Sequence, residues 1–66
     1  MKLRNNLRKI RLEQNITQQK LADAVGVSRK TINTIENSVF IPSTIISLKI
    51  SRVLGSSVED IFFLDE

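Results

Sequence analysis

The 66-residue sequence contains neither cysteine nor histidine. The absence of cysteine excludes disulfide bonds and thiolate nucleophiles, and without either residue type the usual zinc sites cannot form. The chain also lacks the side chain best suited to general acid–base catalysis at neutral pH. Glu59 and Asp60 are adjacent carboxylates, but they fall in a predicted helix start with no catalytic partner nearby. We therefore expect no enzymatic activity, no metal or other cofactor, and no small-molecule ligand.

Long apolar runs are also missing. No segment approaches the length of a membrane span, and no apolar stretch follows the basic N-terminal residues as it would in a secretion signal. No linker or low-complexity segment divides the chain, and 66 residues suffice for one small core. We predict a single cytoplasmic domain over residues 1–66 that binds no membrane.

Charge is plentiful but unevenly distributed. All ten lysines and arginines lie in residues 1–56 with only three acidic residues, whereas residues 57–66 hold four acidic residues and no basic one. A basic body favours a polyanionic partner such as nucleic acid. A surplus of basic residues also occurs on ordinary solvated protein surfaces, so charge alone does not identify the partner.

Apolar residues at helical spacing predict five helices. The first covers about residues 6–14, with Asn5 as its candidate cap. The residues expected to cap the other four helices are Thr17, Ser28, Ser43 and Ser57. Gly26 and Gly55 stand where the second and fourth helices should end.

Residues 21–37 end one amphipathic helix and begin another almost at once. Gly26 permits a left-handed turn, and Ser28 restarts a helix two residues later, so two short helices should cross at a steep angle. Their apolar residues point toward a shared core. The outward positions of the second helix are then Arg29, Lys30, Asn33 and Thr34, all of which can reach a base edge or a phosphate.

The segment TQQKLADAVGVSRKTINTIEN, residues 17–37, resembles the helix-turn-helix of the lambda repressor and Cro (XRE) type of DNA-binding domain. The matching apolar, small and glycine positions are Leu21, Ala22, Val25, Gly26, Val27, Ile32 and Ile35. The resemblance extends from LRKIR through IPS to VEDIF and is closest to small stand-alone repressors of the cytolysin-regulator kind. One departure is Ser38, because family members often have glycine after the Glu-Asn pair.

This resemblance implies an all-α, five-helix repressor-like fold that binds specific DNA sequences. The base contacts it implies in the major groove are Ser28, Arg29, Lys30, Asn33 and Thr34. The phosphate contacts it implies are Thr17, Gln18 and Asn37. It also implies a structural ion pair between Arg11 and Glu36. The alternatives are an ordinary solvated helix face and side chains that serve only as helix caps.

The two ends of the chain support a further prediction. Apolar and basic residues alternate over residues 1–4, and IFFLD is rich in strand-forming residues, so the termini could pair as a short two-stranded antiparallel sheet. In the related small repressors the resemblance implies such a sheet and a symmetric homodimer. The residues expected at the dimer interface are Phe62, Phe63 and Leu64, with core packing of one or two of them an open alternative. The apolar group that could join them is Val39, Phe40 and Ile41.

The predicted function is regulation of transcription by a homodimer that binds an inverted-repeat operator in double-stranded DNA and acts as a repressor. Two half-sites about 34 Å apart suit a protein with twofold symmetry. An antitoxin-like or other partner-binding protein could use the same domain to hold a protein ligand. A non-specific nucleic-acid-binding protein would instead show steep salt dependence without a preferred sequence.

Overall fold

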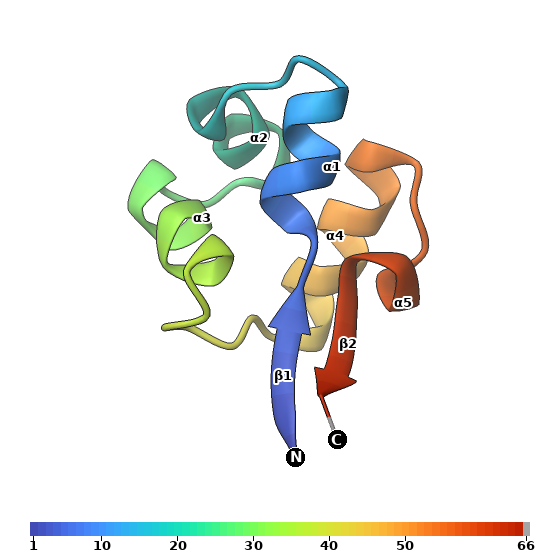
Figure 1. The fold of residues 1–66 in the computed structure, drawn as a ribbon. Coiled ribbons are helices and arrows are strands. Elements are labelled where there is room, and N and C mark those ends of the chain that lie inside the picture. Colours follow the sequence, from blue (N-terminus) through green and yellow to red (C-terminus); the bar gives the residue numbers. More distant parts are fainter. Residues whose placement is uncertain (66) are drawn as a thin grey trace.

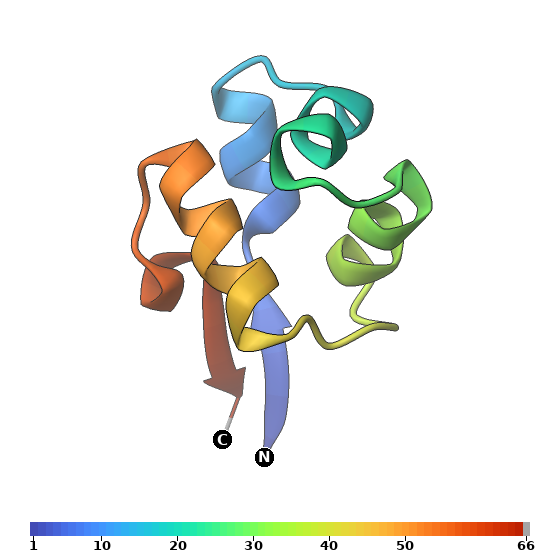
Figure 2. The same ribbon diagram turned by 180° about the vertical axis from the view of Figure 1, so that it is seen from behind.

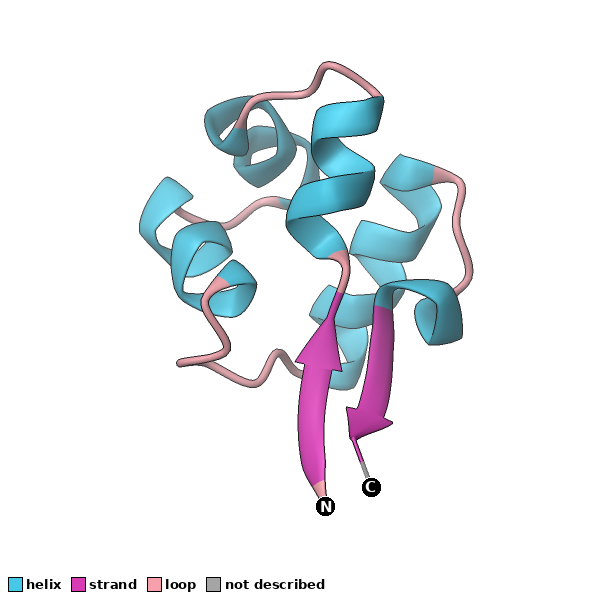
Figure 3. Cartoon of the chain, in the orientation of Figure 1, coloured by secondary structure: helices cyan, strands magenta, loops and turns pink. Residues whose placement is uncertain are grey.

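The computed structural model describes residues 1–65, which form five helices and a two-stranded sheet (Figures 1 and 3). In chain order the elements are β1 (Lys2–Asn5), α1 (Leu7–Glu13), α2 (Gln18–Val25), α3 (Arg29–Glu36), α4 (Thr44–Leu54), α5 (Val58–Ile61) and β2 (Phe62–Asp65). β1 and β2 pair antiparallel, with Leu3 opposite Leu64 and Asn5 opposite Phe62. The predicted five-helix architecture with a sheet built from the termini is confirmed.

Hydroxyl groups set the starts of four helices. The hydroxyls of Thr17, Ser28, Ser43 and Ser57 each accept a hydrogen bond from the backbone N–H three residues further along. Each bond satisfies one of the N–H groups that a helix start leaves without an intrahelical partner. The helix starts were therefore predictable from single residues.

Asn5 organises the start of α1 in a different way. Its Oδ1 accepts a hydrogen bond from the backbone N–H of Leu7 at 3.1 Å, and its Nδ2 donates to the carbonyl of Ile35 at 2.9 Å. One side chain thus ties β1 to both α1 and α3. The end of the sheet nearest the helices is held against the core by this contact.

The core lies between the five helices and the adjoining end of the sheet. Its buried apolar residues are Leu7, Leu21, Ala22, Val25, Ile32, Ile35, Ile50, Leu54, Ile61 and Phe62. Burying a large side chain of this kind contributes about 1.5–3 kcal/mol. α4 is the most apolar helix in the sequence, yet it leaves Ile45, Leu48 and Val53 exposed. Within the described part of the chain, no helix has the length and apolar character needed to cross a lipid bilayer.

Two left-handed positions shape the chain around α3. Gly26 has φ +86° and donates its N–H to the carbonyl of Ala22 at 2.8 Å, which closes α2 and directs the chain into the turn before α3. Ser38, just after α3, has φ +60°. A side chain in this conformation costs roughly 1–2 kcal/mol, which glycine avoids. The turn at Gly26 is therefore unstrained, whereas the turn at Ser38 is strained.

Replacing Gly26 by Ala is expected to lower the free energy of unfolding by about 1–2 kcal/mol, because alanine is strained at this φ. No atom lies within 4 Å of the position that the new Cβ would occupy, so the cost is conformational rather than steric. Urea denaturation measures the change. The matched variant Ser38→Gly relieves strain instead, and we expect it to unfold at the same or a slightly higher urea concentration. A Gly26→Ala protein as stable as the wild type would contradict this account of the turn.

Candidate nucleic-acid interface

α3 presents a polar, cationic face to solvent. Arg29, Lys30 and Asn33 are exposed, whereas Ile32 and Ile35 on the opposite side are buried in the core. This division follows from the helical period, since residues three apart lie on one face. The side chains available to a ligand on this helix are therefore hydrogen-bond donors and positive charges.

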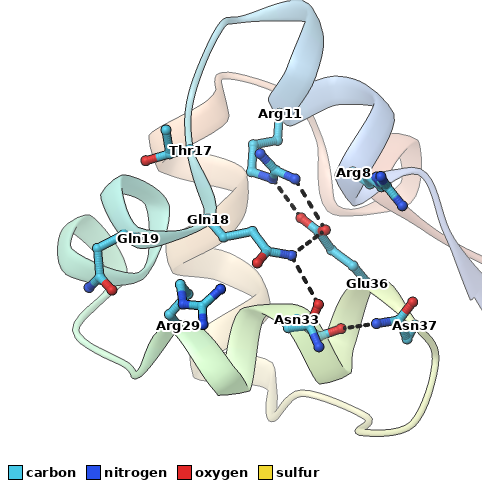
Figure 4. A pocket seen from close by; sticks show the side chains of 9 residues that line it. All are labelled: Arg8, Arg11, Thr17, Gln18, Gln19, Arg29, Asn33, Glu36 and Asn37. Carbon is cyan, nitrogen blue, oxygen red and sulfur yellow. Dashed lines mark hydrogen bonds and ion pairs between the residues drawn. The ribbon is translucent and has the colours of Figure 1, made fainter.

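The acidic residue of α3 is turned inward and neutralised. The Arg11 side chain donates from Nε to Glu36 Oε2 at 2.7 Å and from Nη2 to Glu36 Oε1 at 3.3 Å (Figure 4). Its Nη1 donates to the carbonyl of Ile16 at 2.8 Å. The two side chains are only 8% and 2% exposed. The pair, which is the one that the family resemblance implies, joins α1 to the end of α3.

Gln18 connects this ion pair to the exposed face of α3. Its Nε2 donates to Glu36 Oε1 at 2.9 Å and to Asn33 Oδ1 at 3.2 Å (Figure 4). Gln18 is the first residue of α2. The hydrogen bond between Gln18 and Asn33 holds Asn33 Oδ1 toward Gln18. It does not use the two N–H groups of the Asn33 amide. Asn33 is therefore oriented as a donor toward solvent.

These side chains line a hollow of about 520 Å³ between α1, the start of α2 and α3 (Figure 4). Its lining residues are Arg8, Arg11, Thr17, Gln18, Gln19, Arg29, Asn33, Glu36 and Asn37. Three arginines and one glutamate give the lining a net charge of 3 − 1 = +2. Because Arg11 and Glu36 neutralise each other, this charge comes from Arg8 and Arg29. Such a concave, positive surface favours an anion.

The structure brings most of the predicted contact residues to this hollow. Thr17, Gln18, Arg29, Asn33 and Asn37 all line it, although their contacts with DNA stay predictions. Asn37 lies beside Asn33 because its Nδ2 donates to the Asn33 carbonyl at 2.9 Å.

The three other predicted base contacts lie elsewhere on α3 or at its start. Lys30 is exposed, whereas the hydroxyls of Ser28 and Thr34 already bond within the helix. Ser28 Oγ accepts from the N–H of Thr31 at 3.1 Å, and Thr34 Oγ1 donates to the carbonyl of Thr31 at 2.9 Å. Free donors are therefore concentrated at Arg29, Lys30 and Asn33.

Two lining residues, Arg8 and Gln19, were missed by the reasoning from sequence. Arg8 precedes Arg11 by three positions, a spacing that places both on one side of α1. That spacing could have revealed Arg8, since Arg11 was already expected to approach α3. Gln19 follows Gln18 and donates from Nε2 to Asp23 Oδ1 at 2.8 Å, an i,i+4 pair within α2, but this spacing does not indicate that Gln19 lines the hollow.

The predicted dimer-interface residues separate into two groups. Phe62 is 8% exposed and belongs to the chain's own core, so it is not available at a surface of the folded chain. The expectation for Phe62 is therefore corrected, because the first residue of β2 lies over the helices. Phe63 and Leu64 are exposed.

Residues 7–61 match the family model described as helix-turn-helix. An uncharacterized HTH-type transcriptional regulator of Methanothermobacter thermautotrophicus is 45% identical over 65 residues, which cover 97% of this chain and 94% of that protein. The uncharacterized HTH-type transcriptional regulator YgzD of Bacillus subtilis is 34% identical over 64 residues, 97% of each chain. The clp gene regulator ClgR of Corynebacterium glutamicum superimposes with a TM-score of 0.78 and 30% identity over 82% of this chain. This chain covers 57% of ClgR, little more than half of its length.

Replacing Glu36 by Ala is expected to lower the free energy of unfolding by about 3–5 kcal/mol, because the Arg11 charge would stay buried without its partner. The matched control is Asp65→Ala, which removes the exposed Arg4–Asp65 pair and should cost less than about 1 kcal/mol. Urea denaturation of both variants provides the comparison. An equal decrease in the free energy of unfolding of the two variants would contradict the structural role of the buried pair.

Proposed function

Because the chain belongs to the helix-turn-helix family of DNA-binding transcriptional regulators of the lambda repressor and Cro (XRE) type, we propose that it binds specific sequences in double-stranded DNA and represses transcription. The proposal rests on the exposed face of α3, where Arg29, Lys30 and Asn33 protrude while Glu36 is held inward. Repression would follow from occupying an operator and excluding polymerase. A regulator of this kind would act in the cytoplasm.

In the proposed complex α3 lies in the major groove and reads base edges. Arg29 and Lys30 are suited to the O6 and N7 acceptors of guanine. Asn33 would donate from Nδ2 to the N7 of a purine, and adenine is the expected base because Oδ1, which uses one lone pair for Gln18, can accept from the N6 amino group with the other. Ser28 and Thr34 would make secondary contacts, since their hydroxyls already bond within α3.

The phosphate contacts would come from the hollow beside α3. Thr17 and Gln18 lie at the N-terminus of α2, where backbone N–H groups and the positive end of the helix dipole favour an anion. Asn37 would contact the same strand from the end of α3. Arg8 and Arg29 supply the positive charge that attracts the backbone. These contacts would fix the position of α3 in the groove without selecting a sequence.

We propose that a homodimer binds an inverted repeat. Half-sites on one face of B-DNA lie about 34 Å apart, and the longest dimension of one copy is 32 Å, so two neighbouring copies can span that distance. The paired termini support kinship with the small stand-alone repressors of the cytolysin-regulator kind, for which such a sheet and a symmetric dimer are implied.

Selection from random DNA duplexes with the full chain should recover an inverted repeat whose half-sites are separated by one helical turn, because each α3 would read one half-site. Sequencing of the bound pool gives the site directly. Recovery of no common sequence, together with a steep loss of binding in salt, would instead indicate non-specific binding.

The double variant Arg29→Ala/Lys30→Ala should lose at least about 30-fold in its preference for the selected site over random DNA, since each bidentate base contact contributes about 1–3 kcal/mol. Competition gel shifts measure this ratio. The control is Lys49→Ala/Arg52→Ala, which removes the same charge from the outer side of α4 and should keep the preference. Unchanged preference in the α3 variant would contradict the groove contacts and favour a protein-binding role.

A further inference from the structure

The side-chain amide of Gln18 uses both of its N–H groups within the chain. A glutamine amide carries two N–H donors and one acceptor oxygen. Nε2 donates to Glu36 Oε1 at 2.9 Å and to Asn33 Oδ1 at 3.2 Å, so the nitrogen faces two oxygens (Figure 4). The group that remains for a further ligand is the Gln18 oxygen, which can only accept a hydrogen bond.

The Glu36 carboxylate fixes which way this amide is turned. An ionised carboxylate only accepts hydrogen bonds, so the nitrogen of Gln18 faces it and the Gln18 oxygen points elsewhere. Glu36 is itself bonded to Arg11, and its side chain is only 2% exposed. The orientation of the Gln18 amide therefore follows from the buried ion pair.

The orientation of Gln18 in turn determines that of Asn33. Asn33 is exposed, and the terminal torsion of an asparagine side chain is broad and roughly twofold, so its amide alone would present either oxygen or nitrogen to a ligand. Gln18 supplies an N–H, which only the oxygen of Asn33 can accept. Exchanging Oδ1 and Nδ2 of Asn33 would place two donors against each other. Asn33 is thus held with its N–H groups available.

The arrangement of the helices makes this contact possible. α2 and α3 lie side by side, on the opposite side of the bundle from α5 in both views (Figures 1 and 2). A side chain at the start of α2 therefore reaches the middle of α3, although Gln18 and Asn33 are 15 residues apart in the chain. Gln18 is half-buried, so these hydrogen bonds run from a buried charge to an exposed side chain.

We propose that Gln18 is a positioning residue for sequence recognition, which holds Asn33 in the orientation that reads a purine, and that its side chain does not bind phosphate. The inference rests on the proposed function and names a residue on which its sequence preference depends. Phosphate oxygens accept hydrogen bonds, and the free group of the Gln18 side chain is also an acceptor. The part of Gln18 suited to phosphate is its backbone N–H at the start of α2.

Gln18→Met tests the inference, because it removes both donors and keeps a side chain of similar length and helix propensity. The base pair read by Asn33 is the one at which Asn33→Ala loses its preference in competition gel shifts. At that base pair we expect Gln18→Met to lower the preference at least about threefold, as for the loss of one hydrogen bond. Its affinity for random duplexes should stay within about twofold of the wild-type value, because no phosphate contact is lost.

Gln19→Met is the matched control, since Gln19 also lines the hollow but bonds to Asp23 within α2. It should keep the wild-type preference at every base pair. A double-variant comparison identifies the route by which Gln18 acts. In the Asn33→Ala background, Gln18→Met should cause no further loss at this base pair. A loss as large as in the wild-type background would overturn the inference.

A measurement without DNA tests the orientation itself. In the isotope-labelled free chain, the heteronuclear NOE of the side-chain amides should show Asn33 ordered in the wild type and in Gln19→Met, and mobile in Gln18→Met. Circular dichroism checks that both variants keep the wild-type helix content. An Asn33 amide equally mobile in the wild type and in Gln18→Met would overturn the inference.

The outcomes separate this inference from the proposed function. If Gln18→Met weakens binding to every duplex equally and keeps the base preference, its side chain contacts phosphate, and the inference is overturned while DNA recognition stands. A wild-type chain that selects no sequence would overturn the proposed function. The NMR comparison then still decides whether Gln18 holds Asn33 in place.

Discussion

The buried ion pair between Arg11 and Glu36 is the contact on which the exposed surface of α3 depends. Removing two charges from water is unfavourable unless each is well paired and hydrogen-bonded. Here the pair is satisfied by two Arg11–Glu36 hydrogen bonds, the carbonyl of Ile16 and the amide of Gln18. The geometry of three helices is fixed by these bonds. The same contact removes the acidic charge of α3 from the surface, so that only donors and cations face outward.

Gln18 and Asn5 each connect α3 to a neighbouring part of the fold by a side-chain hydrogen bond. Gln18 bonds to Asn33 and so orients a polar side chain on the exposed face. Asn5 bonds to the carbonyl of Ile35 and so anchors β1 to the same helix. Because both amides bond to α3, the sheet and the exposed face of α3 share one support. A shift of α3 would disturb the sheet as well as the hollow.

Features set by single residues were predictable from sequence, and the strand-like ends and the family resemblance also indicated the terminal sheet and the Arg11–Glu36 pair. Individual hydrogen bonds between elements, and the faces on which side chains lie, were not predictable. Hydroxyl caps such as Thr17 and the left-handed turn at Gly26 follow from local chemistry and appear where predicted. Gln18 and Asn33 were each expected near DNA, but the hydrogen bond between them depends on how α2 and α3 cross. The faces of Phe62, Phe63 and Leu64 depend on strand register, and a slip of one residue would exchange them.

The antiparallel pairing of β1 with β2 has a consequence for synthesis of the chain. Asn5 pairs with Phe62, and the N–H of Asn6 donates to the carbonyl of Ile61 at 2.8 Å. β1 can therefore pair only after residues more than fifty positions later in the chain have been synthesised. Ile61 and Phe62 are also core residues. A nascent polypeptide therefore cannot complete this core until residue 62 has left the ribosome. Until then the helices lack the packing that Ile61 and Phe62 supply to the core.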